Sequence, residues 1–398
     1  MTDQPQRPRP STRIGQIAGD SDGWEVFNRS RQMIAEGRSV TELTQGEHDI
    51  PTDPSILDAM AASARGGATG YAPVPGEMRL RDVVAARLTE RTGVPTEARN
   101  VMITPGGQSA LFAAHMAVCD PGDRALYIDP YYATYPGTIR AAGAQAVAVV
   151  TRPEDGFVPR KADLAALAPG ARSFLINSPN NPTGGVYSPA VLEQIAGIVQ
   201  EHDLWLISDE VYDTQVWDGA HLSPRSLAGM AERVLVVGSM SKSHAMTGSR
   251  VGWIAGPAPV IAHLIDLATV TTYGVPGFLQ EAAVFALGQG RAFEDRISAP
   301  FRRRRDIAAR VLGQRRGLRL HRPEAAMYVM VDIRATGLSG AAFANRLLDE
   351  HAIAVMPGES FGVATAGHLR IALTVEDAQL EGALTVLGDM ADALSETG

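Results

Sequence analysis

A series of short apolar runs, rich in branched side chains, constrains the fold of this chain more than any other feature. The runs are ALYID (125–129), QAVAVV (145–150), SFLIN (173–177), LWLIS (204–208), RVLVVGS (233–239) and VGWIAG (251–256). They do not alternate between apolar and polar residues, which is typical of strands covered on both faces. Helical patterns lie between them, such as PAVLEQIAGIVQEH at 189–202. The sequence therefore predicts a doubly wound α/β sheet, which binds ligands at the carboxyl ends of its strands.

The pattern changes after about residue 296. A helical stretch, PFRRRRDIAARVL, is followed by two strand-like runs, MYVMVDI and HLRIALT, and by a closing helical segment. These segments predict a second, smaller α+β domain. The arginine run 302–305 is expected to form a solvated helix face rather than a nucleic-acid patch, because the formal net charge of the chain is −8.

Composition narrows the class of protein. Hydrophobic residues make up 45% and charged residues 20%, as in an ordinary globular protein. No run of about 18 apolar residues occurs, so no membrane span is expected, and the first residues lack the apolar stretch of a secretory signal. The acidic charge disfavours nucleic acid as a partner. The single cysteine, Cys119, excludes a multi-cysteine metal site and is expected to pack in the interior, and no metal is expected. These features together predict a cytoplasmic enzyme.

The strongest chemical motif is Ser239-Met-Ser-Lys242-Ser-His-Ala-Met-Thr-Gly-Ser-Arg250, which directly follows the strand-like run RVLVVG. A pocket at the end of a strand would desolvate the Lys242 ammonium and lower its pKa, as an amine that attacks a carbonyl requires. Ser239 and Arg250 supply a hydroxyl and a guanidinium suited to a phosphate. The alternative interpretation of this motif is a surface loop.

Three further loops follow strand-like runs. Gly106-Gly107-Gln108 joins VMIT to a helical pattern, and free N–H groups at such a helix start bind anions, although a simple turn capped by a serine has the same sequence. Asp209, followed by Tyr212, can pair with a protonated ring nitrogen or cap a helix. Asn181 lies in a loop stiffened by two prolines, where it can donate to a ring oxygen or belong to a long turn.

The order of these motifs resembles the class I/II aminotransferases of pyridoxal-phosphate fold type I. The motifs are the Gly-Gly loop, Asn-Asn-Pro-Thr-Gly, Ser-Asp-Glu-x-Tyr, Ser-x-Ser-Lys and Gly-x-Arg-x-Gly. The resemblance runs from about Val40 to the C-terminus, and it is specific because five separate loops agree in order and spacing. It implies a small domain formed by 13–47 with 296–398 and a large cofactor-binding domain at 48–295, while the Pro and Arg content of the first residues predicts a flexible tail at 1–12.

The resemblance also implies how pyridoxal 5′-phosphate would be held. Lys242 would carry the cofactor as a Schiff base and then shuttle the proton, Asp209 would pair with the pyridine nitrogen, and Tyr212 and Asn181 would meet the ring oxygen. The phosphate would be held by Gly107, Gln108, Ser239 and Arg250, with Ser241 as a helper.

The family places an aromatic ring on the face of the cofactor, and Tyr132 fits its Pro-x-aromatic pattern better than Tyr131. Tyr71 resembles the tyrosine that reaches the phosphate of the neighbouring subunit, which implies a homodimer with shared active sites. For the substrate carboxylate, the resemblance points to Arg370, whose alternative is a surface salt bridge, and to Gly46. The family usually has a proline where this chain has His48.

The implied reaction transfers the α-amino group of an amino acid to pyruvate or 2-oxoglutarate in two half-reactions. Within the family, the segments 241–248 and 24–26 are most similar to arginine–pyruvate transaminases, and the chain also resembles bacterial aspartate aminotransferase-like proteins. A basic donor would need acidic pocket residues, for which Glu47, His48 and Asp49 are candidates. Aspartate is expected to be a weak donor, because Gln108 stands where many aspartate-specific relatives have a lysine. The alternative function is a carbon–sulfur β-lyase or a cyclopropane-forming synthase on the same scaffold.

Overall fold

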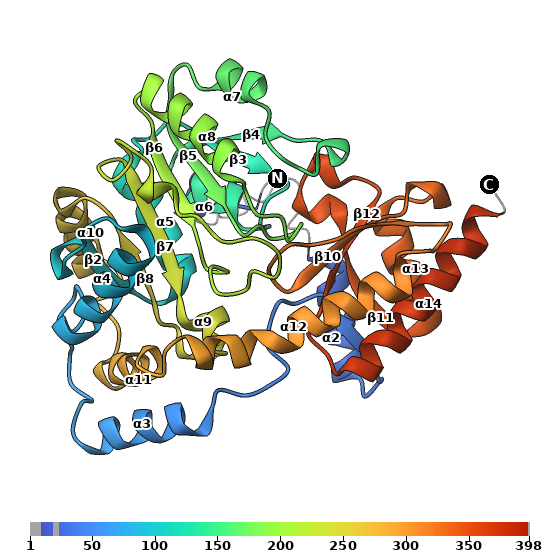
Figure 1. Cartoon of the computed structure of the whole chain (residues 1–398), viewed down its shortest axis with the longest axis horizontal. Helices are drawn as coiled ribbons and strands as arrows, with labels where there is room; N and C mark the ends of the chain where they lie inside the picture. Colours follow the sequence, from blue (N-terminus) through green and yellow to red (C-terminus); the bar gives the residue numbers. More distant parts are fainter. Residues whose placement is uncertain (1–8, 19–23, 397–398) are drawn as a thin grey trace, which may run out of the picture.

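The computed structural model describes residues 9–18 and 24–396, and these form two sheets, each packed against helices (Figure 1). The expected tail at 1–12 lies mostly outside the described residues, and the first helix begins at Thr12. In the described part of the chain, no helix is long and apolar enough to cross a membrane.

The larger sheet has seven strands in the order β2-β8-β7-β6-β5-β3-β4. They are β2 (Val101–Thr104), β3 (Arg124–Asp129), β4 (Gln145–Val150), β5 (Ala171–Asn177), β6 (Trp205–Asp209), β7 (Val234–Ser239) and β8 (Gly252–Ala255). Only β8 runs antiparallel to its neighbours. The apolar runs of the sequence thus form the expected, mostly parallel sheet.

Helices cover both faces of this sheet, which explains why its strands lack alternation. One face packs against α5 (Gly106–Val118), α6 (Tyr135–Ala141) and α10 (Ala258–Val270). The other packs against α4 (Met78–Thr92), α7 (Lys161–Leu167), α8 (Pro189–Glu201) and α11 (Gly277–Leu287), with α3 (Pro54–Arg65) lying on α11. Cys119, at the end of α5, is buried, as expected.

The smaller sheet has the order β1-β11-β12-β10-β9 and combines both ends of the chain. Its strands are β1 (Thr41–Leu43), β9 (Arg319–His321), β10 (Tyr328–Asp332), β11 (Ile353–Pro357) and β12 (His368–Ala372). The helices α2 (Glu25–Ala35), α12 (Arg291–Leu312), α13 (Gly340–His351) and α14 (Asp377–Ser395) share its core. Figure 1 shows α12 running between the two sheets. The division at residues 47 and 296 stays a prediction.

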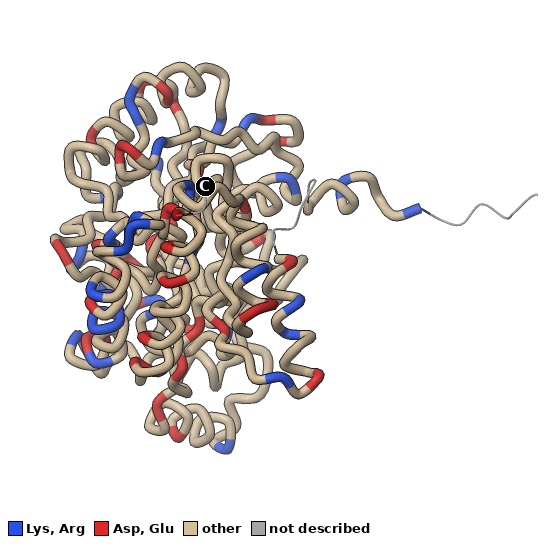
Figure 2. The backbone as a smooth tube through the Cα atoms, turned by 90° about the vertical axis from the view of Figure 1, so that its right-hand side faces the viewer, with Lys and Arg blue, Asp and Glu red and all other residues tan. Residues whose placement is uncertain are grey.

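The arginine run in α12 is only in part the solvated face that the sequence predicts: Arg302 and Arg303 are exposed, whereas Arg304 and Arg305 are buried. The side chains of Arg304 and Arg305 are each 3% exposed, and they form ion pairs with Asp49 and Asp218 respectively. These carboxylates lie in distant segments of the chain, so no local pattern indicates the pairing. Elsewhere, acidic and basic residues are mixed along the backbone (Figure 2).

Candidate active site

A cavity of about 360 Å³ lies where the carboxyl ends of the larger sheet meet the smaller sheet. Every site residue predicted from the sequence lines this cavity except Tyr71: Gly46, Gly107, Gln108, Tyr132, Asn181, Asp209, Tyr212, Ser239, Ser241, Lys242, Arg250 and Arg370. The volume is within the range of small-molecule sites. Segments separated by more than 300 residues thus contribute to one pocket.

Lys242 lies on the short helix α9 (Met240–Ser243), directly after β7. Its Nζ donates a hydrogen bond to the carbonyl oxygen of Gly46. Burial lowers the pKa of Lys242 to about 8; the carboxylate of Glu47 opposes this change, and Arg370 and Arg250 add to it. Near neutral pH a larger fraction of this amine than of an ordinary lysine is therefore unprotonated and nucleophilic.

The first turn of α5 and Arg250 form one side of the cavity. Gly106 has a φ of +78°, and a Cβ atom there would lie 2.2 Å from Nη2 of Arg250, so only glycine fits. The first N–H groups of α5 have no partner within the helix, and its dipole places partial positive charge there. The side chain of Gln108 is committed to Thr134 and Thr138 at 2.9 Å each, which leaves its backbone N–H for a ligand. This arrangement suits a phosphate group.

Ser239 and Ser241 lie next to this anion site. Ser239 Oγ accepts a hydrogen bond from the backbone N–H of Ser241 at 3.1 Å and lies 2.9 Å from Ser241 Oγ. Both hydroxyls line the cavity. They can reorient toward an anion because hydroxyl rotors adapt to their partners.

Asp209 ends strand β6 and is buried. The Tyr135 hydroxyl donates a hydrogen bond of 2.6 Å to Asp209 Oδ2. Burial raises the pKa of Asp209 to about 6, although the bonds from Tyr135 and from the backbone N–H of Val211 lower it. Sequence reasoning missed Tyr135, because nothing in the sequence near α6 indicates that its ring reaches β6.

Arg370 points into the cavity from β12 and is 2% exposed. Its Nη1 donates to Asn181 Oδ1 at 3.0 Å, its Nη2 donates to the carbonyl oxygen of Thr44, and its Nε has no hydrogen-bond partner within the described residues. No carboxylate pairs with it in the described part of the chain, so the alternative prediction, a surface salt bridge of Arg370, is wrong. A buried guanidinium with unused donor capacity is suited to an anionic ligand.

Aromatic rings complete this side of the pocket. One of them, Tyr328, was missed by the sequence analysis. Its hydroxyl oxygen lies 3.0 Å from the hydroxyl oxygen of Tyr212, and its ring packs on the Arg370 guanidinium. A Cβ atom on Gly46 would lie 1.7 Å from Tyr328 Oη, so a larger residue cannot occupy that position. Of the two tyrosines after β3, Tyr132 lines the cavity and Tyr131 packs against Tyr127.

The three acidic-pocket candidates have different environments. Glu47 lines the cavity and accepts a hydrogen bond of 2.7 Å from Thr247. Asp49 is instead held by Arg304 in an ion pair. His48 packs edge-on against Phe301, and burial lowers its pKa to about 3, so it is neutral. Only Glu47 presents a negative charge to a ligand.

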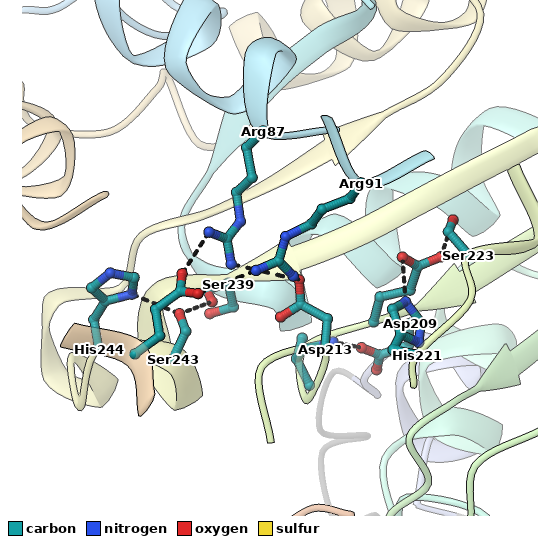
Figure 3. A network of polar contacts seen from close by, with 12 residues as sticks. Arg87, Arg91, Asp209, Asp213, His221, Ser223, Ser239, Ser243 and His244 are labelled. Carbon is teal, nitrogen blue, oxygen red and sulfur yellow. Dashed lines mark hydrogen bonds and ion pairs between the residues drawn. The ribbon is translucent and has the colours of Figure 1, made fainter. Parts of the chain in front are cut away.

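Behind the cavity, a network of charged side chains fixes the loop that carries Tyr212. Arg87 and Arg91 of α4 both form ion pairs with Glu294 of α12 and with Asp213, the residue after Tyr212 (Figure 3). Further along, His221 pairs with the Glu210 carboxylate at 3.0 Å. The sequence gives no signal for these contacts, because most join residues more than 100 positions apart.

Tyr71 lies outside the cavity and is 92% exposed. Its ring packs edge-on against Tyr273, at 5.2 Å between centroids. Val270 and Met78 are also exposed, at 80% and 58%. Within one chain, Tyr71 therefore does not contribute to the pocket.

Comparisons with known proteins agree on one family. A family model described as aminotransferase class I and II matches residues 38–387. An arginine–pyruvate transaminase from Pseudomonas aeruginosa is 43% identical over 361 residues, covering 90% of this chain and 92% of that protein. An aspartate/prephenate aminotransferase from Thermus thermophilus is 35% identical over 363 residues, covering 90% and 93%. The solved aspartate aminotransferase of Thermus thermophilus with maleate is similar with a TM-score of 0.90 at 34% identity, covering 96% of this chain and 100% of that one.

Proposed function

This chain belongs to the class I and II aminotransferases, pyridoxal-phosphate enzymes that move amino groups from amino acids to 2-oxo acids, and we propose that Lys242 holds the cofactor and moves the proton. The observation that carries this proposal is the convergence of an amine of lowered pKa, an anion site and a buried carboxyl group on one cavity. The β-lyase alternative is not favoured, because the similar proteins are transaminases.

The residues of the cavity fit pyridoxal phosphate group by group. The first turn of α5, with Gly107 and Gln108, would hold the phosphate together with Arg250 and two serines, Ser239 and Ser241. Asp209 would pair with the ring nitrogen, Asn181 and Tyr212 would meet the ring oxygen, and the Tyr132 ring would cover one face. When bound, the cofactor supplies an electron sink for the negative charge that develops at the Cα atom of the donor.

The protein's own groups then divide the work. Arg370 binds the α-carboxylate of the donor through its planar fork, and Gly46 leaves room for that carboxylate. Lys242 Nζ accepts the Cα proton as a general base, which its lowered pKa favours near neutral pH. Asp209, ionised and hydrogen-bonded by Tyr135, keeps the proton on the ring nitrogen.

The absorption spectrum of the purified enzyme tests this assignment. The wild type should show a visible band that is lost on adding an amino donor. Reduction with borohydride should also remove the band and leave the cofactor attached to Lys242 through a secondary amine. The Lys242→Ala variant should lack covalent attachment and lose at least about 1,000-fold in kcat, since it lacks the general base. A Lys161→Ala variant, changed on the distant helix α7, is the matched control. Native turnover by Lys242→Ala would contradict the proposal.

We further propose that the donor has a basic side chain, and a comparison of charges supports this. In the lining of the cavity, Arg250 would serve the phosphate, Arg370 the α-carboxylate and Asp209 the ring nitrogen, while Lys242 reacts. Glu47 is then the charged lining residue without an assigned role, and the group that donates to it, the Thr247 hydroxyl, is neutral. The name of the Pseudomonas relative, arginine–pyruvate transaminase, agrees with a cationic donor. Aspartate would be a weak donor, and pyruvate or 2-oxoglutarate the acceptor.

Replacing Glu47 by Gln tests the donor class. The ratio of kcat/KM for arginine to that for alanine should fall by about 10-fold, because a charge-assisted contact is lost while the hydrogen bond from Thr247 keeps an acceptor. Glu47 also raises the pKa of Lys242, but that effect changes both donors equally, so it cancels in the ratio. Glu97→Gln, on the exposed surface, is the control. An unchanged ratio would exclude Glu47 as the donor's partner.

We also propose a homodimer in the cytoplasm, in which Tyr71 reaches the phosphate of the partner subunit. The exposed rings of Tyr71 and Tyr273, which pack against each other, support a partner surface at this position, because such groups gather where another chain covers them. The acidic charge and the single cysteine are compatible with the cytoplasm, which stays a prediction.

A further inference from the structure

Away from the cavity, three side chains that can ligate a metal converge on the smaller sheet. They are His321 on β9, Asp332 at the end of β10 and His368 at the start of β12. Each offers one ligand atom, and these atoms all lie within 4.8 Å of one another. Asp332 is directly opposite His368, and His321 is opposite Met330, two residues before Asp332, so all three project from one face.

The two imidazole rings have free nitrogen atoms. The Nε2 atoms of His321 and His368 are buried and have no hydrogen-bond partner within the described residues. The Nδ1 atom of His368 lies 3.0 Å from the carbonyl oxygen of Ala366. Donation from Nδ1 to this carbonyl places the lone pair on Nε2, the arrangement seen for histidines that bind metals. Buried polar atoms without a partner are uncommon, so these two call for a ligand.

The carboxylate of Asp332, the third side chain of the group, is held in position by Arg334. Arg334 donates to both carboxylate oxygens of Asp332, from Nε at 2.9 Å and from Nη2 at 2.6 Å. Each carboxylate oxygen accepts more than one bond, so a lone pair stays available, and Oδ2 lies 4.0 Å from His368 Nε2. The ring of Phe157 packs against both histidines, while the partial exposure of His321 and Asp332 leaves a route from solvent.

We propose that His321, Asp332 and His368 bind one divalent cation of the Zn²⁺ class, with water in a fourth position. Two imidazoles and one carboxylate suit zinc or cobalt, whereas Ca²⁺ and Mg²⁺ prefer sets of oxygen ligands. Ligand atoms around tetrahedral zinc lie about 3.3 Å apart, so the three ligand atoms approach one another by up to about 1.5 Å when the ion binds. None of the three residues lines the catalytic cavity, so the ion has no part in the transfer reaction.

The consequence of binding is mechanical. The ion joins the edge strand β9 to β10 and to β12, the strand that carries Arg370 two residues after His368. A bound cation therefore raises the melting temperature of the protein and leaves kcat unchanged. Sequence reasoning predicted no metal site, because the ligands are spread over 48 residues without a spacing motif.

Cobalt binding to the cofactor-loaded, metal-free enzyme without a histidine tag tests the proposal. Co²⁺ should bind at one equivalent per chain with the visible bands of a tetrahedral site, and Zn²⁺ should displace it. His321→Gln should weaken binding by at least about 100-fold, since it removes a ligand, and should abolish the rise in melting temperature. His263→Gln, at an exposed histidine on α10, should behave as the wild type.

Two outcomes would overturn the proposal. One is the absence of a stoichiometric cobalt complex in the wild type. The other is equal cation affinity in the wild type and in His321→Gln, with the metal-free variant melting at the wild-type temperature. His368→Gln provides a second test of the same site, and its far-ultraviolet circular dichroism shows whether this central strand still folds. Under either of the two overturning outcomes, water rather than a metal ion would occupy the space between the two rings.

Discussion

Asp209 has the carboxyl group that the cofactor ring would meet, and Tyr135 controls its ionisation. Burial raises the pKa of Asp209 to about 6, and the 2.6 Å bond from Tyr135 opposes that rise by stabilising the carboxylate. Such second contacts often decide whether an active-site group is charged. Tyr135 therefore acts as a positioning residue through Asp209.

Replacing Tyr135 by Phe should raise the pKa of Asp209. Because Asp209 acts in its ionised form, activity should fall most at low pH and recover as the pH rises above the new pKa. We expect this pKa to rise by about one unit, equivalent to the ~1.4 kcal/mol of one charge-assisted hydrogen bond, so kcat/KM should fall by about 5-fold near pH 6 and by about 10-fold at lower pH. The pH profile of kcat/KM measures the change, because its acidic limb should move to higher pH.

Tyr187→Phe is the control for this profile. Tyr187 is also buried, but its hydroxyl has no hydrogen-bond partner within the described residues and does not line the cavity. A uniform loss at every pH in Tyr135→Phe would mean that the ring only packs, and the link to Asp209 would be wrong.

At the scale of elements, the start of α5 depends on the absence of a side chain at Gly106. Gly106→Ala should weaken cofactor binding by more than about 10-fold, because it combines a positive φ, costing ~1 kcal/mol or more, with a contact of 2.2 Å to Arg250. Equilibrium dialysis of the cofactor measures the effect. Gly197→Ala, inside α8 with open space at the Cβ position, should bind cofactor normally. Equal affinities in the two variants would contradict the anion site.

The place of each site residue in its strand or helix explains which of them could be predicted from the sequence. The strands and the residues after them were predictable, because a parallel sheet brings the loops that follow its strands to one edge. Asp209 is the last residue of its strand, and Lys242 and Asn181 lie three and four residues after the ends of theirs, so local motifs identified them. Tyr135 and Tyr328 were missed because they reach the cavity from the start of a helix and from the first residue of a strand of the other sheet.

Long-range ion pairs were missed for a similar reason. Arg304 pairs with Asp49, 255 residues away, and Arg91 pairs with Asp213, 122 residues away. A run of arginines has the same composition whether its side chains face solvent or lie buried beside carboxylates of distant segments. Burial of charge is decided by tertiary packing, which a local pattern does not encode.

At the scale of the whole molecule, the position of Tyr71 distinguishes a site shared between two subunits from a site formed by one subunit alone. The cavity of one chain contains every predicted cofactor contact except this side chain, which is 92% exposed. If Tyr71 serves the partner's phosphate, each site needs Lys242 from one subunit and Tyr71 from the other. Symmetric dimers exchange such contacts reciprocally.

Mixing two impaired variants tests this arrangement. Lys242→Ala and Tyr71→Ala should each be impaired as homodimers. After subunit exchange in equal amounts, half of the dimers are mixed, and each mixed dimer has one site with both residues intact. Activity should return to about a quarter of the wild-type value. A mixture of Lys242→Ala with Arg250→Ala should recover nothing above its parents, because Lys242 and Arg250 line the same cavity of one chain. If Tyr71 acted within its own subunit, no mixed dimer would contain an intact site, and the first mixture would stay as inactive as the control.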